Sequence, residues 1–450
     1  MTFDPIYVVK MELSEPLPSF NSSNTFRGIR YGQVQILACL HDHPLGLIEV
    51  PFVEDTLQPS MYGPVIWSEL AQKINGHLEY DGLPQLNQLP PAGVPGRDEA
   101  RCEAEKKRLL NDPPLISVVI CTHERPDMLI GCLDSVSRLN YPNFEIVIVD
   151  NAPKTDATQN LVTTKFQHLS NLRYVIEPNQ GQCWARNTGA LAAQGSIIAY
   201  TDDDVIVDAN WLIGVLRGFA AGESVGAVNG LTIPAELETI EQVWFEHSGG
   251  FNKGYDRAIF DMQRNKPSRP FYPLSAGIFG TGANLSIKKS ALEKVGYFDP
   301  ALGAGTITTC GDDLAMYVQL LYAGYQLVYE PTACIQHIHR RDFPSLQDQI
   351  HNYGVGFAAF LTKTLLDHPE ILPGFLLGIP YGVYLLFHPK SFKNTKKTTS
   401  YPSKLKRLEY FGMLKGGPAY IISRFRSRRM IRPEASAAPV SPRAPGARGE

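Results

Sequence analysis

The fold is decided by the stretch Leu115-Ile-Ser-Val-Val-Ile-Cys121 and by a second stretch of the same kind, Phe144-Glu-Ile-Val-Ile-Val-Asp150. Both are continuous apolar runs rich in β-branched residues, a pattern typical of parallel strands buried on both faces of a sheet. A helix-compatible segment at 128–139 separates the two runs. After the second run come helix-compatible segments at 158–168 and 184–194 and strand-like segments at 172–177 and 196–201. Strands that alternate with helices of this length predict βαβ units and an open α/β sheet.

Ligands of open α/β sheets bind beyond the carboxyl ends of the strands, so the residues that follow the strands carry the functional information. Three of these strand ends are Thr122-His-Glu-Arg-Pro126, Asp150-Asn-Ala-Pro153 and Asp202-Asp-Asp204. Three adjacent carboxylates repel one another unless a cation or hydrogen-bond donors compensate them. Because Mg²⁺ takes one or two carboxylates together with phosphate and water, the triplet predicts a metal–phosphate site. A solvated acidic turn before the helix at Trp211 is the alternative.

Two further segments have polar groups at the start of a helix. In Asn179–Gly189, Arg186 lies in the first turns of a predicted helix, where backbone amides and a guanidinium suit a phosphate or a nucleotide ring. We expect Gly189 to serve helix packing only. In Cys310-Gly-Asp-Asp-Leu314, two carboxylates open an amphipathic helix. Acids in a first helical turn often only complement the helix dipole, and that interpretation of Asp312 stays open.

In this order the motifs resemble the family 2 glycosyltransferases of the GT-A fold. The resemblance covers Leu115 to Arg341, about half of the chain. Its motifs are Cys-Thr-His-Glu-Arg-Pro, Val-Asp-Asn, Gly-Gln-Cys-Trp-Ala-Arg-Asn-Thr-Gly, Thr-Asp-Asp-Asp, Gly-Thr-Gly-Ala-Asn and Gly-Asp-Asp-Leu. Each motif is weak alone, whereas the ordered set is specific. It implies an α/β GT-A domain at 114–345 that moves a sugar from a nucleotide-diphospho-sugar, most commonly a UDP-sugar, to an acceptor hydroxyl.

The resemblance also implies roles for single residues. It places the donor nucleotide against Thr122, Glu124, Asp150, Arg186, Asp202 and Asp203. It makes Asp204 a ligand of Mn²⁺ or Mg²⁺ bound to the diphosphate, and Asp313 the general base of an inverting reaction. Asp312 would be a supporting contact to the acceptor.

Asp312 stands where the family pattern has glutamate, so a catalytically silent nucleotide-sugar binder stays open as an alternative. A GT-A-like nucleotidyltransferase is a second alternative. The missing Gly-rich N-terminal phosphate loop with Arg or Lys counts against it.

Downstream of these motifs, His337 and His339 alternate on an extended segment, so only one of them can face the site. The resemblance favours His337 as a metal ligand or a diphosphate contact. Trp244, Phe271 and Tyr272 lie where an acceptor platform could form, although core packing is the expectation for each one singly.

Residues 1–80 are predicted to form a small β-rich unit, with strand-like runs at 5–11, 32–40 and 46–52. We expect His41 and His43 to lie in a solvated hairpin turn rather than at a metal, because no third ligand lies nearby in the sequence. A proline-rich linker and a charged helix are expected over 81–113.

Composition bounds the class of protein. The 450 residues suffice for two or three domains, and 44% hydrophobic with 19% charged residues excludes wholesale disorder and a polytopic membrane protein. The seven cysteines are scattered and form no CxxC pair, which argues against a disulfide framework and a structural zinc site. We therefore expect a reducing cytosol, and the first residues show no secretory signal.

The formal net charge of −3 hides an uneven distribution. Residues 390–432 hold thirteen Lys and Arg against one acid, Glu409, so this segment carries +12 and the remainder −15. Residues 371–387 precede it without a charge, but Pro373 and Pro380 interrupt them, and their length is at the lower limit for a bilayer span.

These features predict a helical segment at 346–432 that binds peripherally to an anionic membrane, at the inner face of the cell membrane. A lipid-linked or polysaccharide acceptor could be met there. A true span and a buried helical hairpin with a solvated basic tail are the alternatives. Nucleic acid is not an expected partner, because no reader module is present. Residues 433–450 are predicted to be disordered.

Overall fold

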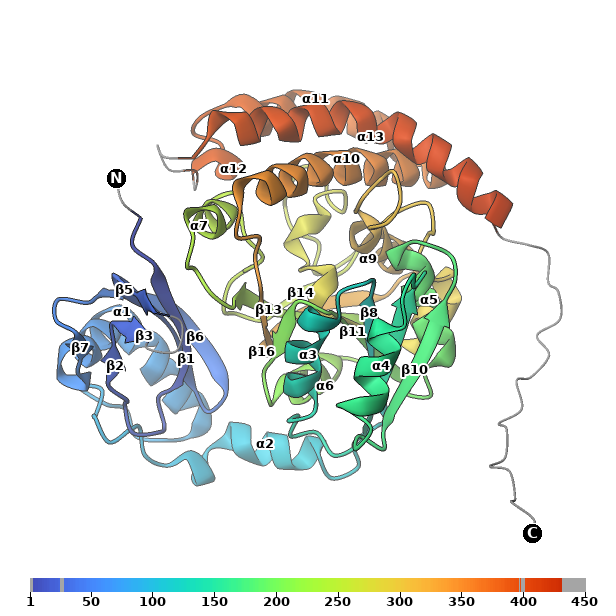
Figure 1. Cartoon of the computed structure of the whole chain (residues 1–450). Coiled ribbons are helices and arrows are strands. Elements are labelled where there is room, and N and C mark those ends of the chain that lie inside the picture. Colours follow the sequence, from blue (N-terminus) through green and yellow to red (C-terminus); the bar gives the residue numbers. More distant parts are fainter. Residues whose placement is uncertain (1–2, 25–27, 396, 398–400, 431–450) are drawn as a thin grey trace, which may run out of the picture.

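Three parts of the chain can be followed in the computed structural model: an N-terminal unit, a central sheet domain and a layer of C-terminal helices (Figure 1). The structure describes residues 3–24, 28–395, 397 and 401–430. The predicted disordered tail at 433–450 lies outside the described residues.

The central sheet has the order β10-β9-β8-β11-β15-β13-β16-β12, with β14 paired to β16. Strands β8, β9, β10 and β11 run parallel, and β15 is antiparallel to both of its neighbours. The open α/β sheet expected from the sequence is thus present. The strands are β8 (Ile116–Thr122), β9 (Phe144–Asn151), β10 (Leu172–Glu177), β11 (Ile197–Asp202), β12 (Val205–Val207), β13 (Val225–Pro234), β14 (Ala258–Phe260), β15 (Leu285–Lys288) and β16 (Gln326–His337).

Helices cover both faces of this sheet, because alternate strand residues point to opposite sides. On β8, Val119 packs with residues of α5, α8 and α9, whereas Val118 and Ile120 pack with α3, α4 and α6. Gly189 of α5 lies against the sheet, where a Cβ would come 2.4 Å from the Val119 side chain. The helices are α3 (Pro126–Val136), α4 (Ala157–Thr164), α5 (Gln182–Ala192), α6 (Trp211–Phe219), α7 (Ile240–His247), α8 (Lys289–Val295) and α9 (Asp312–Tyr322).

The N-terminal unit consists of a three-stranded sheet and a long helix that was not predicted from the sequence. Strand β5 lies between a parallel β1 and an antiparallel β6, and small pairs β2–β7 and β3–β4 lie beside them. The expectation of a purely β-rich unit at 1–80 is corrected by α1. The elements are β1 (Ile6–Glu12), β2 (Phe20–Asn21), β3 (Ser23–Asn24), β4 (Ile29–Arg30), β5 (Gln33–Leu40), β6 (His43–Pro51), β7 (Thr56–Leu57) and α1 (Pro59–Asp81).

The hairpin between β5 and β6 is tighter than the sequence suggested. His41 and Asp42 both have positive φ, 52° and 67°, as a two-residue hairpin turn requires. The Glu12 carboxylate accepts both of their backbone N–H groups, at 2.8 and 2.9 Å. The expectation that His41 is solvated is wrong, because its side chain is fully buried. It points into the unit, toward α1.

The N-terminal unit packs on the β13–β16 side of the central domain. Leu37 and Cys39 of β5 share a buried apolar cluster with Leu231, Ile233 and Cys334. After α1, a proline-containing loop leads to the connector helix α2 (Arg101–Leu109), which runs below the two units in Figure 1. The linker and charged helix expected over 81–113 therefore bridge two domains.

The C-terminal helices lie across one edge of the central domain, with α11 and α13 on the side of α10 that faces away from the sheet (Figure 1). They pack closely through glycines: a Cβ on Gly354 of α10 would come 2.1 Å from the Glu409 carbonyl oxygen of α13. The helices are α10 (Phe343–Asp367), α11 (Leu372–Phe387), α12 (Phe392–Thr395) and α13 (Ser403–Met430).

Helix α11 is exposed rather than buried. Leu377 is 84% exposed, and Leu414 of the neighbouring α13 is 76% exposed. Among the described residues, 369–387 are the one helical stretch that length and apolar composition would allow to cross a membrane. The alternative of a buried hairpin is therefore excluded for α11.

Candidate functional site

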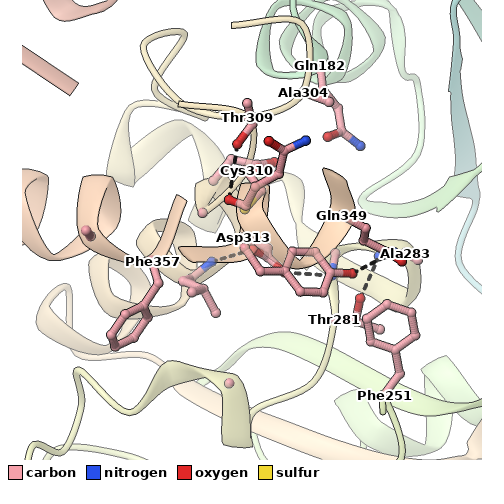
Figure 2. A pocket seen from close by; sticks show the side chains of 18 of the residues that line it. Gln182, Phe251, Thr281, Ala283, Ala304, Thr309, Cys310, Asp313, Gln349 and Phe357 are labelled. Atoms are coloured by element: carbon pink, nitrogen blue, oxygen red, sulfur yellow. Dashed lines mark hydrogen bonds between the residues drawn. The ribbon is translucent and has the colours of Figure 1, made fainter. Parts of the chain in front are cut away.

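One large cavity of about 1240 Å³ opens where the parallel strands of the central sheet end. Its polar end is formed by the ends of β8 and β11, by the loop at 280–283 and by the start of α9, and its apolar end by α10 and α11. Figure 2 looks into the cavity: Asp313 lies in its middle, between Phe357 on one side and Thr281 on the other.

In the acidic run at the end of β11, Asp203 and Asp204 are buried, Asp202 is half-buried, and all three carboxylates have partners. Thr122 donates to Asp203 Oδ2 at 2.8 Å. Arg125 reaches both following acids, with Nη1 2.8 Å from Asp203 Oδ1 and Nη2 2.9 Å from Asp204 Oδ2. Asp202 accepts from Gln182 Nε2 at 3.2 Å. The alternative of a solvated acidic turn is therefore wrong.

Arg125 is a residue of this site that was not predicted from the sequence. It follows β8 in the same Thr-His-Glu-Arg-Pro stretch that was quoted for Thr122. The signal was its position directly after a buried strand. It supplies the hydrogen-bond donors that a set of adjacent carboxylates needs.

The three acids have different electrostatic environments. Burial raises the pKa of Asp203 to about 7, although Arg125 opposes the shift. Burial also raises the pKa of Asp202, with Arg186 again opposing. Burial would raise the pKa of Asp204 as well, but His337 and Arg125 outweigh it and hold the pKa below its usual value. Asp204 is thus the acid of the run best suited to remain ionised.

The two histidines of β16 and its extension face different partners. His337 Nε2 lies 3.4 Å from Asp204 Oδ1, whereas His339 Nε2 lies 2.8 Å from Glu246 Oε1 on α7. Burial lowers the pKa of His337 to about 4, so its imidazole is neutral near pH 7. The structure therefore brings His337, and not His339, to the acidic run.

Arg186 connects the acidic run to the start of α9. Its guanidinium is buried and pairs with Asp312, and Nη2 lies 3.4 Å from Asp202 Oδ1 and donates to the Gly282 carbonyl at 3.2 Å. Asp312 is therefore engaged by Arg186 rather than free for an acceptor.

Asp313 has a different environment from Asp312. Its carboxylate accepts the backbone N–H of Gly282 at 2.9 Å and that of Leu314 at 2.8 Å. Burial raises its pKa to about 6, Asp312 adds to the rise, and Arg186 opposes it. A carboxylate with such a pKa is ionised at pH 7 and can still accept a proton readily.

Two residues assigned to the donor nucleotide lie elsewhere. Glu124 accepts the backbone N–H groups of Lys154 and Thr155, so it holds the loop after β9. Asp150 is fully buried and accepts from Tyr174 OH at 2.7 Å. Neither residue lines the cavity, but Asn151, next to Asp150, does. The lining of the cavity does not include these two residues, and their assignment to the nucleotide stays a prediction.

Of the three proposed platform aromatics, Phe271 lines the cavity. Its ring lies 5.9 Å from that of Phe375 on α11. Trp244 packs edge-on against Phe343. Tyr272 packs against Phe279 and donates its hydroxyl to the Asp261 carbonyl. Core packing, the expectation for each one singly, thus describes Trp244 and Tyr272.

The apolar end of the cavity was not expected from the sequence. Side chains of α11, including Phe375, Ile379, Val383 and Leu386, line it opposite the acids. The segment interpreted as a membrane contact is therefore also a wall of the site. The cavity can hold a ligand with both a charged and an apolar part.

The acidic run also has the donor set for a divalent cation. One atom each from Asp202, Asp204 and His337 lie within 4.8 Å of one another. His337 Nδ1 is buried and, within the described ranges, has no hydrogen-bond partner. Carboxylate oxygens suit hard cations such as Mg²⁺ and Mn²⁺, so these residues fit the expected metal.

The chain is similar to known glycosyltransferases. Residues 117–296 match the family model described as glycosyl transferase family 2. The poly-β-1,6-N-acetyl-D-glucosamine synthase of Staphylococcus epidermidis is 25% identical over 226 residues, 48% of each chain. The glycosyltransferase AglE of Haloferax volcanii is 27% identical over 221 residues, 48% of this chain and 64% of its own.

The chain thus spans about half of the first of these relatives and less than two thirds of the second. Among solved structures, the mannosyltransferase PcManGT from Pyrobaculum calidifontis, in complex with GDP-Man and Mn²⁺, is 19% identical. It covers 72% of this chain and 93% of its own, with a TM-score of 0.42.

Proposed function

Because the central domain belongs to glycosyl transferase family 2 and has its GT-A fold, we propose that the protein transfers a sugar from a nucleotide-diphospho-sugar to an acceptor hydroxyl. One observation carries the proposal. The cavity holds a carboxylate set to stay ionised, Asp204, and a carboxylate set to take a proton, Asp313. Sugar transfer with inversion needs both kinds.

On the donor side, we assign the nucleotide to the polar end of the cavity, at the ends of β8 and β11. Thr122, Asn151, Arg186, Asp202 and Asp203 are among the polar residues that line this end. The donor is proposed to be a UDP-sugar, the commonest donor in the resembling family. The metal ligands would be Asp204 and His337, with Asp202 as the third member of the same group.

Bound Mn²⁺ or Mg²⁺ would supply positive charge against the leaving diphosphate. The chain itself supplies the proton acceptor. As the acceptor hydroxyl attacks the anomeric carbon and the bond to the diphosphate breaks, Asp313 takes the hydroxyl proton. The backbone N–H groups of Gly282 and Leu314 hold its carboxylate in place. Attack from the side opposite the leaving group inverts the anomeric centre.

On the acceptor side, the apolar wall made by α11 supports a lipid-linked acceptor. The outer side of α11 and α13 exposes large apolar side chains such as Leu377 and Leu414, and the segment 390–432, which follows α11 and includes α13, is strongly basic. An apolar surface flanked by Lys and Arg suits an anionic bilayer. We therefore place the protein peripherally on a membrane, at its cytoplasmic face, with α11 between the lipid and the cavity.

Nucleotide release tests the proposal. Purified full chain is incubated with Mn²⁺, a panel of UDP- and GDP-sugars and a lipid-linked sugar acceptor, and free nucleoside diphosphate is measured. We expect release with one donor class, stimulated by the acceptor, and a product whose anomeric configuration is inverted by NMR. Donor binding without release from any donor would favour the catalytically silent binder and overturn the proposal.

A further inference from the structure

A second group of potential metal ligands lies far from the cavity, where the N-terminal unit meets the connector helix. Its members are His41 in the β5–β6 turn, His77 and Asp81 on the last turns of α1, and Cys102 in the first turn of α2. One donor atom of each residue lies within 4.8 Å of all the others. The four residues are 36, 4 and 21 positions apart in the sequence, which matches no metal-binding motif that spacing would reveal.

The four side chains converge on one point. His41 Nδ1 lies 2.7 Å from Asp81 Oδ2, His77 Nε2 lies 3.0 Å from it and Cys102 Sγ lies 3.2 Å from it. His41, Asp81 and Cys102 are buried, and the His77 side chain is 10% exposed.

The surrounding backbone fixes each of these residues. His41 is held in the left-handed region by the Glu12 carboxylate. His77 and Asp81 are four residues apart, so they share one face of α1. The Cys102 backbone N–H donates to Asp81 Oδ1 at 2.9 Å, which ties the start of α2 to the end of α1. The group is therefore positioned by the fold rather than by chance contact.

Three donor groups of the cluster share one acceptor oxygen. His41 Nδ1, His77 Nε2 and Cys102 Sγ all lie within 3.2 Å of Asp81 Oδ2. One carboxylate oxygen has two lone pairs, so it cannot accept fully from all three groups. A cation held between the four side chains would relieve this competition.

We propose that this group binds one Zn²⁺ through His41, His77, Asp81 and Cys102. Nitrogen, oxygen and thiolate donors in a set of four are the ligands of closed, tetrahedral structural zinc sites. Bonds of 2.0–2.3 Å place such donors about 3.4 Å apart. The spacings here, 2.7–3.2 Å from Asp81 Oδ2 and at most 4.8 Å between any two donors, lie on either side of that value. The thiolate and the carboxylate together balance the ion, so the buried site would carry no net charge.

The position of the group indicates what the ion would do. It would join the hairpin turn and α1 of the N-terminal unit to α2, the only described link between that unit and the central domain along the chain. Arg217 of α6 approaches the Cys102 carbonyl at 3.5 Å, so the same point also touches the central domain. The inferred zinc would therefore link the two units. Its ligands are separate from those of the cation proposed for the cavity.

Zinc content and cobalt absorption test this inference. Untagged full chain, purified without chelators, is expected to contain about one zinc per chain by mass spectrometry. Replacing zinc with Co²⁺ should give the intense visible bands of a tetrahedral site and a near-ultraviolet thiolate-to-metal band. Cys102→Ser should abolish the thiolate band, and His77→Gln should lower zinc content at least about tenfold.

Two matched variants serve as controls. Cys334→Ser removes a different buried cysteine, and Asp204→Asn removes a ligand of the cavity site. Both should keep the zinc content and the cobalt spectrum. A wild-type chain with less than about 0.1 zinc and no cobalt bands would overturn the inference. So would a thiolate band that persists in a folded Cys102→Ser protein. The wild-type measurements decide even if that variant does not fold.

Discussion

Replacing Asp313 by asparagine should abolish sugar transfer and at the same time make the protein more stable at pH 7. The carboxylate is half-buried at the wall of the cavity, and burial with the neighbouring Asp312 raises its pKa from 3.8 to about 6. At pH 7 the folded chain therefore holds an ionised group in a place that disfavours its charge. Asparagine removes that charge with nearly the same shape.

The magnitude follows from the pKa shift. A rise of about two units corresponds to roughly 3 kcal/mol of lost stability once the group is ionised in both states. Asparagine cannot accept from both the Gly282 and the Leu314 N–H groups as the carboxylate does, which costs about 1 kcal/mol. The net gain for Asp313→Asn is on the order of 1–2 kcal/mol.

The pH dependence has a definite sign. A raised carboxyl pKa means that the folded state binds the proton more tightly than the unfolded state does. The stability cost is therefore absent below pH 4, grows between about 4 and 6 and is complete above 6. The advantage of the variant should appear at pH 7–8 and vanish or reverse at pH 4.

Thermal unfolding at several pH values and nucleotide release at pH 7 measure the two effects. Transfer should fall at least about 100-fold while donor binding is kept, because general-base catalysis contributes that much. Asp348→Asn is the control, since it removes an exposed carboxylate from the rim of the same cavity. A folded Asp313→Asn protein that keeps more than about a tenth of the activity, or one that is less stable at pH 7, would refute the reasoning.

Other predictions address the metal, the base and the membrane surface. Asp204→Ala should abolish Mn²⁺-dependent nucleotide binding in calorimetry, and unchanged affinity would contradict its assignment as a ligand. Wild-type transfer should rise roughly tenfold between pH 5 and 7, because Asp313 with a pKa of about 6 must be ionised to act; a flat profile would exclude it as the base. Leu377→Asp with Leu414→Asp should abolish flotation with anionic liposomes, whereas wild-type protein should float and lose binding as salt increases.

The sequence was informative where local pattern and structure coincide. The β-branched runs at 115–121 and 144–150 became β8 and β9 because such runs are stable only between two layers of helices. Helix α1 also carried a signal that was overlooked: Tyr62, Ile66, Leu70, Ile74 and Leu78 recur every four residues and are all buried.

Other features depend on the third dimension and could not be derived from spacing. Asp150 and Asn151 are neighbours on one strand, so they face opposite sides, and a shift of one residue decides which of them lines the cavity. Likewise, His41 and Cys102 are 61 residues apart and meet only because α1 returns the chain to the hairpin turn. Sequence spacing alone does not predict such long-range contacts.

The position of α11 has a consequence for the size of the acceptor. One side of this single helix lines the cavity, and its opposite side is exposed. If that outer side rests on a bilayer, the lipid surface and the reacting carboxylates are separated by the thickness of one helix, about 10 Å, and by the width of the cavity. The helix would then set the distance between the lipid surface and the reacting carboxylates. It would admit acceptors whose reacting sugar is close to the lipid, and it would stop serving a glycan once that glycan has grown away from the membrane.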